Sequence, residues 1–158
     1  MMEIRVDPYL IASSPSNTFI KLKERDGSRE INFTVSPASV YYFFKTTKDV
    51  DLGQPVIHKA MIDVLKILGA KIEKVVVDHF ASDMFLCHVY VKIAEQTHIL
   101  AIHITDAIIL AVVQGCPLFV LEDVFNKSAE RQVAGQADIS NEKALEMFED
   151  IDPKKLPS

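Results

Sequence analysis

His103 and Asp106 stand three residues apart at a strand-to-helix junction, in the segment AIHITDAIILAVVQGCPLFV. An imidazole at a strand end and a carboxylate at a helix start can converge on one pocket. There they could act as a general base or as ligands of a hard metal ion. The alternative interpretation is structural: Asp106 complements the helix dipole and His103 pairs with it. Local sequence alone leaves both interpretations open.

The remaining histidines and cysteines form no recognised metal or nucleophile motif. The spacings HxH, HxxxH and HExxH are absent, so no zinc signature is present. Cys87 and Cys116 each lie in an apolar segment, which predicts reduced core thiols. A second polar cluster of Asp78, His79 and Asp83 is expected in a turn, where small polar residues are needed in any case.

The helix that begins near Asp106 has clear predicted boundaries. We expect Thr105 as its N-cap, because a threonine hydroxyl can accept a hydrogen bond from an amide of the first turn. The segment 107–114 is almost wholly apolar, which predicts a buried helix. Gly115 and Pro117 then predict the helix end, and Leu118 to Leu121 a short buried strand.

Strand and helix patterns elsewhere predict an α+β fold, with a mixed or antiparallel sheet and packed helices. Strands are predicted at 3–11, 17–23, 30–35, 71–80, 83–93 and 97–104, helices at 37–46, 56–68 and 140–150, and a short helix or turn at 122–127. Pro8 favours a strand edge or a bend. The segment 128–138 resembles a linker. We therefore expect one domain over residues 1–128, followed by a linker and an acidic C-terminal helix over 129–158.

Two stretches share the order strand, turn, strand, capping residue and apolar helix. They run from Phe19 to Phe44 and from Phe85 to Val113, and Ser36-Pro37-Ala38 aligns with Thr105-Asp106-Ala107. This shared order indicates an internal duplication of a strand–strand–helix unit.

Composition and charge limit the class of protein to which the chain can belong. The 158 residues are 49% hydrophobic and 25% charged, the mixture of an ordinary globular domain. No apolar run reaches the ~20 residues of a membrane helix, and MMEIRVDPYL lacks the features of a signal peptide, so we expect a cytoplasmic protein without a membrane span. The net charge of −5 disfavours a general nucleic-acid binder, although much of the negative charge lies in the tail.

Three sequence blocks, in order, resemble the bifunctional nuclease domain family. They are QPVIHKAMIDVLKILGAKIEKVVVDHF, MFLCHVYVKI and HITDAIILAVVQGCPLFVLEDV, and the resemblance spans about Asn17 to Lys127. It implies an α+β fold with DNase and RNase activity. It also implies a site role for His58, which matches the histidine of the family's helix start, and for Asp106, which matches the aspartate of an Asp-Ala motif.

The chain departs from the family pattern around these residues. His103 and Ile104 stand where the family usually has Arg and Pro, Ala101 where Asp is common, and Lys59 where Asp follows the histidine. The sequence therefore resembles a divergent member of the bifunctional nuclease domain family.

Two functions from different classes follow. In the first, the protein is a nuclease that acts on DNA or RNA through Asp106, His103 and His58, with Asp106 holding a divalent cation such as Mg²⁺ or Mn²⁺. In the second, it is a non-catalytic binding or interaction module that keeps the fold. Such a module would be a homo-oligomer that packs through the aromatic residues Tyr41 to Phe44.

Overall fold

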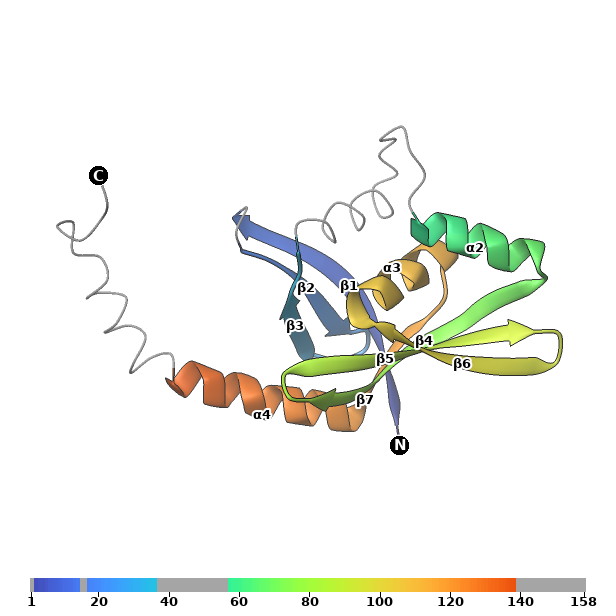
Figure 1. The fold of residues 1–158 in the computed structure, drawn as a ribbon. Coiled ribbons are helices and arrows are strands. Elements are labelled where there is room, and N and C mark those ends of the chain that lie inside the picture. The colour runs from blue at the N-terminus through green and yellow to red at the C-terminus, as the bar shows by residue number, and fades with distance from the viewer. Residues whose placement is uncertain (1, 15–16, 37–56, 139–158) are drawn as a thin grey trace, which may run out of the picture. The chain divides into compact units, whose positions relative to one another are not determined.

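A computed structural model of the chain describes residues 2–14, 17–36 and 57–138. In these residues seven strands form one sheet, and three helices accompany it (Figure 1). The predicted α+β fold is confirmed. The predicted helices at 37–46 and 140–150, with the aromatic residues Tyr41 to Phe44, lie outside the described residues.

The sheet is mixed and mostly antiparallel, as predicted. Its strand order is β3-β2-β1-β7-β4-β5-β6, and β4 with β7 is the parallel pair. The strands are β1 (Glu3–Ser14), β2 (Asn17–Glu24), β3 (Glu30–Thr34), β4 (Ala70–Ala81), β5 (Met84–Ile93), β6 (Gln96–His103) and β7 (Leu118–Leu121). The hairpins β2–β3 and β5–β6 lie at opposite ends of the sheet. They are the strand pairs of the predicted duplication, whose first helix lies outside the described residues.

Within the described residues, Pro8 lies in a part of β1 that pairs with β2 alone. Along β1, the pairing with β2 runs from Val6 to Ser14, whereas the pairing with β7 covers only Glu3 to Val6. Proline has no N–H to donate to a sheet, and it is tolerated where a strand is unpaired on one side. The predicted strand edge at Pro8 is therefore confirmed for this part of β1.

The helices α2 (Ile57–Ile67) and α3 (Ile104–Gln114) pack on each other and on the central strands. From Ala107 to Ala111, every residue of α3 is buried. By contrast, α2 buries His58 and Ile62 and leaves Ile67 83% exposed. None of the helices in the described ranges is both long and apolar enough to cross a membrane.

The two ends of α3 test the predicted caps. Gly115 has the left-handed φ of 73°, and its N–H donates to the carbonyl of Ala111 at 2.9 Å, as its predicted role requires. The prediction that Thr105 is the N-cap is wrong. Strand β6 runs into the helix without a loop, so His103 holds the cap position, with φ −56° and ψ 138°. Thr105 lies buried in the first turn.

The segment predicted as a linker is helical. Helix α4 (Glu122–Asp138) continues through residues 128–138, which are rich in Ala, Glu, Gln and Arg, all good helix formers. Its first turn carries Glu122 and Asp123, which complement the helix dipole. The chain divides into two compact units, Met1–Phe125 and Asn126–Ser158.

Both cysteines are free thiols, as predicted. Burial, together with the nearby charge of Asp78, raises the pKa of Cys87 to about 12, and burial raises the pKa of Cys116 to about 11. Since the thiolate is the nucleophile, neither residue is suited to covalent catalysis at neutral pH.

Candidate functional site

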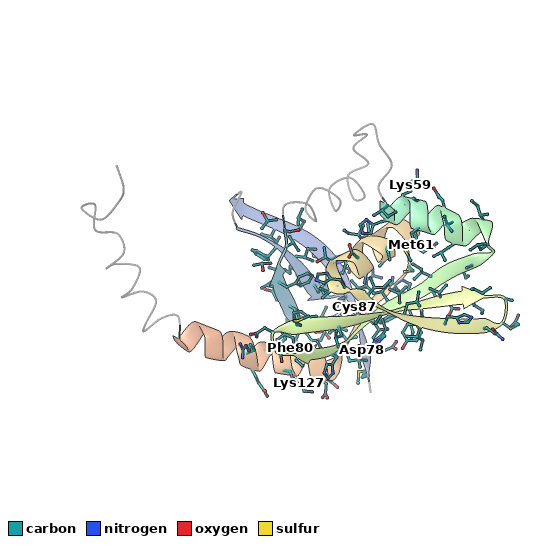
Figure 2. The ribbon with its side chains drawn as sticks, in the orientation of Figure 1. Lys59, Met61, Asp78, Phe80, Cys87 and Lys127 are labelled. Atoms are coloured by element: carbon teal, nitrogen blue, oxygen red, sulfur yellow. The ribbon has the colours of Figure 1, made fainter. Side chains whose placement is uncertain are left out.

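His58 is the second residue of α2, and its side chain is turned into the protein. Only 5% of the residue is exposed, whereas its neighbour Ile57 is 70% exposed. The next residues repeat this contrast: Lys59 is exposed, and Met61 is packed against the core (Figure 2). The start of α2 thus carries a buried imidazole where it packs on α3.

Asp106 lies in the first turn of α3, and 54% of its side chain is exposed. This position agrees with the sequence prediction, and the dipole of α3 favours its negative charge. An exposed carboxylate held at a helix start can take a proton from water or bind a hydrated cation.

The structure joins His58 to Asp106, which is 48 residues further along the chain. The distance from His58 Nε2 to Asp106 Oδ1 is 3.0 Å. An ionised carboxylate can only accept a hydrogen bond, so with ionised Asp106 the imidazole carries a proton on Nε2 and donates it. The buried ring of His58 therefore holds one oxygen of Asp106, while the carboxylate remains accessible to solvent.

His103 makes a different contact. Its Nδ1 accepts a hydrogen bond from the backbone N–H of Thr105 at 3.3 Å. In the neutral ring the proton then lies on Nε2, which is free to act as a donor. Within the described ranges, the partner of the Asp106 carboxylate is His58 and that of His103 Nδ1 is the Thr105 N–H, so the alternative in which His103 pairs with Asp106 is not observed.

The residues around Asp106 limit which metal it could hold. The described part of the chain contains no group of three or more His, Cys, Asp or Glu side chains that could bind a metal ion. Zinc sites need three or four such ligands. Mg²⁺ needs fewer, because it is commonly held by one or two carboxylates together with water and substrate phosphates. Asp106 therefore fits a hydrated Mg²⁺ or Mn²⁺ better than it fits zinc.

One polar pair was not expected from the sequence. The prediction that Asp78 lies in a turn with His79 and Asp83 is wrong. Asp78 lies in β4, and its Oδ2 bonds to Nδ1 of His88 in β5. The turn itself contains Ser82 and Asp83, both with positive φ. The register counted back from this two-residue turn would place Asp78 opposite Cys87, so the pair depends on the bulge between Val77 and His79, for which the sequence gives no signal.

Comparison with known protein families identifies a matching family. A family model described as the bifunctional nuclease domain matches residues 20–132, which is more than half of the 158-residue chain. The match contains His58, His103 and Asp106. A search of curated proteins found no match.

Proposed function

Because this chain belongs to the bifunctional nuclease domain family, we propose that it hydrolyses phosphodiester bonds of nucleic acids through the carboxylate of Asp106. The observation that supports this proposal is the bond between the buried His58 and the exposed Asp106. A carboxylate fixed by a buried donor is preorganised, which is what catalysis of proton transfer requires.

Each residue of the site has a distinct role in this proposal. Asp106 accepts the proton of the attacking water, and His58 positions the carboxylate without touching the substrate. His103 donates from Nε2 to a phosphoryl oxygen, where negative charge increases in the transition state. A divalent cation bound at Asp106 would neutralise phosphate charge and lower the pKa of the water.

A substrate panel tests the proposed activity. Purified protein is incubated with single- and double-stranded DNA and RNA, in Mg²⁺, in Mn²⁺ and in EDTA. We expect DNA cleavage that requires the cation. The cleaving activity should elute with the protein from a sizing column, and it should be lost at the melting temperature of the protein. If no substrate is cleaved under any condition, the proposal fails. Filter binding of the same substrates would then test the alternative of a binding module.

Replacing His58 separates a positioning role from a catalytic one. We expect His58→Ala to reduce cleavage by about 10–100-fold, which is typical when a residue that orients a metal ligand is lost. His58→Gln keeps an amide donor and should recover part of this loss. The rates are measured below the melting temperature of each variant. If His58→Ala cleaves as fast as the wild type, the bond to Asp106 has no part in catalysis.

A further inference from the structure

A second His–Asp pair lies on the β4–β5 hairpin, separate from the bond between His58 and Asp106. His88 Nδ1 bonds to Asp78 Oδ2, and the side chains are 32% and 24% exposed. With Asp78 ionised, the imidazole donates from Nδ1, so that Nε2 presents a lone pair. This arrangement orients a histidine as a general base.

The pair depends on a bulge in β4. Val77 pairs with Cys87 and His79 with Leu86, so Asp78 is the extra residue between them. In a regular hairpin counted back from the turn, Asp78 would stand opposite Cys87, which faces the core. Because of the bulge, the buried Val77 takes the position opposite Cys87, and Asp78 is turned toward His88. Figure 2 labels Asp78 and Cys87 in this part of the sheet. Bulges that re-aim a side chain are frequent next to active sites.

His103 lies on the same face of the sheet as His88. In the regular β5–β6 register, Leu86 pairs with His103 and His88 pairs with Ala101. Paired residues share a face, as do residues two apart in one strand, so the two imidazoles are diagonal neighbours. The Cα atoms of such diagonal neighbours are about 7–8 Å apart. The residue directly opposite His88 is Ala101, whose methyl group leaves room for a substrate, and β6 is the edge strand.

We propose that His88 is a catalytic base specific for RNA, and that His103 binds the same phosphate. This inference rests on the proposed nuclease function and adds a second catalytic group to it, which acts without a cation. His88 Nε2 takes the proton of the ribose 2′-hydroxyl, and the 2′-oxygen forms a bond to phosphorus. The bond from phosphorus to the 5′-oxygen breaks, and the leaving oxygen takes a proton from water. The products are a 2′,3′-cyclic phosphate and a free 5′-hydroxyl.

In this reaction His103 stabilises charge and does not transfer a proton. Its Nδ1 accepts the Thr105 N–H, so its neutral ring donates from Nε2. Because His103 is a diagonal neighbour of His88, this donor can reach an oxygen of a phosphate that lies between the two rings. Asp78 is a positioning residue, which holds the ring of His88 and stabilises its protonated form.

The 2′-hydroxyl distinguishes this reaction from water attack at Asp106. DNA has no 2′-hydroxyl, so the His88 route acts on RNA alone, whereas the Asp106 route can cleave both nucleic acids. The His88 route also needs no cation, because its nucleophile is part of the substrate. RNA cleavage in EDTA therefore reports on His88.

The test uses the full chain and a DNA oligonucleotide that contains a single ribonucleotide, in EDTA. We expect cleavage only 3′ of the ribonucleotide, with a 2′,3′-cyclic phosphate end. His88→Ala should lower this rate by about 10²–10⁴-fold. Asp78→Asn should lower kcat while KM for the oligonucleotide stays unchanged, a split that a merely structural role would not produce. His98→Ala is the matched control, because His98 is an exposed histidine on the opposite face of β6.

Three results would overturn the inference. They are an unchanged rate in folded His88→Ala, a 3′-hydroxyl product end, and no cleavage of the ribonucleotide substrate by the wild type. If DNA is still cleaved in Mg²⁺ in any of these cases, the inference about His88 fails while the proposed function stands. If neither substrate is cleaved in Mg²⁺, Mn²⁺ or EDTA, both fail.

Discussion

Asp106→Asn is expected to lower cation-dependent DNA cleavage by about 10²–10⁴-fold, the usual contribution of a positioned acid–base group. The substitution keeps the shape of the side chain and an oxygen that can accept the N–H of His58. It removes the negative charge, and with it the capacity to take a proton or hold a divalent cation. The loss of charge at the helix start should cost only about 0.3–1 kcal/mol of stability. The variant should therefore fold and fail in catalysis.

A matched substitution controls for this small cost. Asp123 occupies the first turn of α4, as Asp106 does in α3, so Asp123→Asn makes the same chemical change at another helix start. Initial rates on DNA in Mg²⁺ and thermal melts are measured for both variants. Similar melting temperatures of the two variants, together with a rate loss confined to Asp106→Asn, support the assignment of Asp106 as the catalytic carboxylate. Equal rates in Asp106→Asn and the wild type would assign the cleavage to a contaminant.

Helix α3 shows how far local sequence determines structure. Gly115 ends the helix as predicted, because the left-handed position requires a residue that tolerates positive φ. At the start, sequence favours Thr105 as a cap, yet the register of β6 with β5 extends the strand through His103. Strand pairing is a long-range interaction, and here it moved the cap by two residues against a local preference.

The polar pairs depend on long-range structure even more strongly. His58 and Asp106 could be named individually, but their contact arises from the packing of α2 on α3. The pair of Asp78 and His88 requires a bulge that moves the register of β4 by one residue. A shift of one residue exchanges the two faces of a strand. Spacing along β4 would place Asp78 opposite a core residue, so the pair follows only from the observed register.

The sequence predicts a shorter helix than α4 for a different reason. The segment 128–138 has few apolar residues and a glycine, which favoured a linker, whereas the intrinsic helix preference of its other residues favours a helix. Apolar periodicity detects the helices that pack against a core. It is a weaker guide to a helix that is mostly polar.

The core of α3 gives the largest expected effect on stability. Ile108 is 0% exposed, and it belongs to the core cluster that α3 forms with the central strands. Ile108→Ala removes buried methyl and methylene groups and leaves a cavity, which should lower the free energy of unfolding by about 2–5 kcal/mol. Since domains of this kind have about 5–15 kcal/mol in total, this is a large fraction of the stability.

Two further substitutions make the measurement specific to burial. Ile108→Val should cost about 0.5–1.5 kcal/mol. Ile67→Ala makes the same chemical change as Ile108→Ala at a residue that is 83% exposed, and should stay within about 0.5 kcal/mol of the wild type. Urea unfolding is followed by circular dichroism, because the chain has no tryptophan. If Ile108→Ala and Ile67→Ala shift the midpoint equally, α3 is not packed as described, and the position of Asp106 that depends on α3 would be wrong as well.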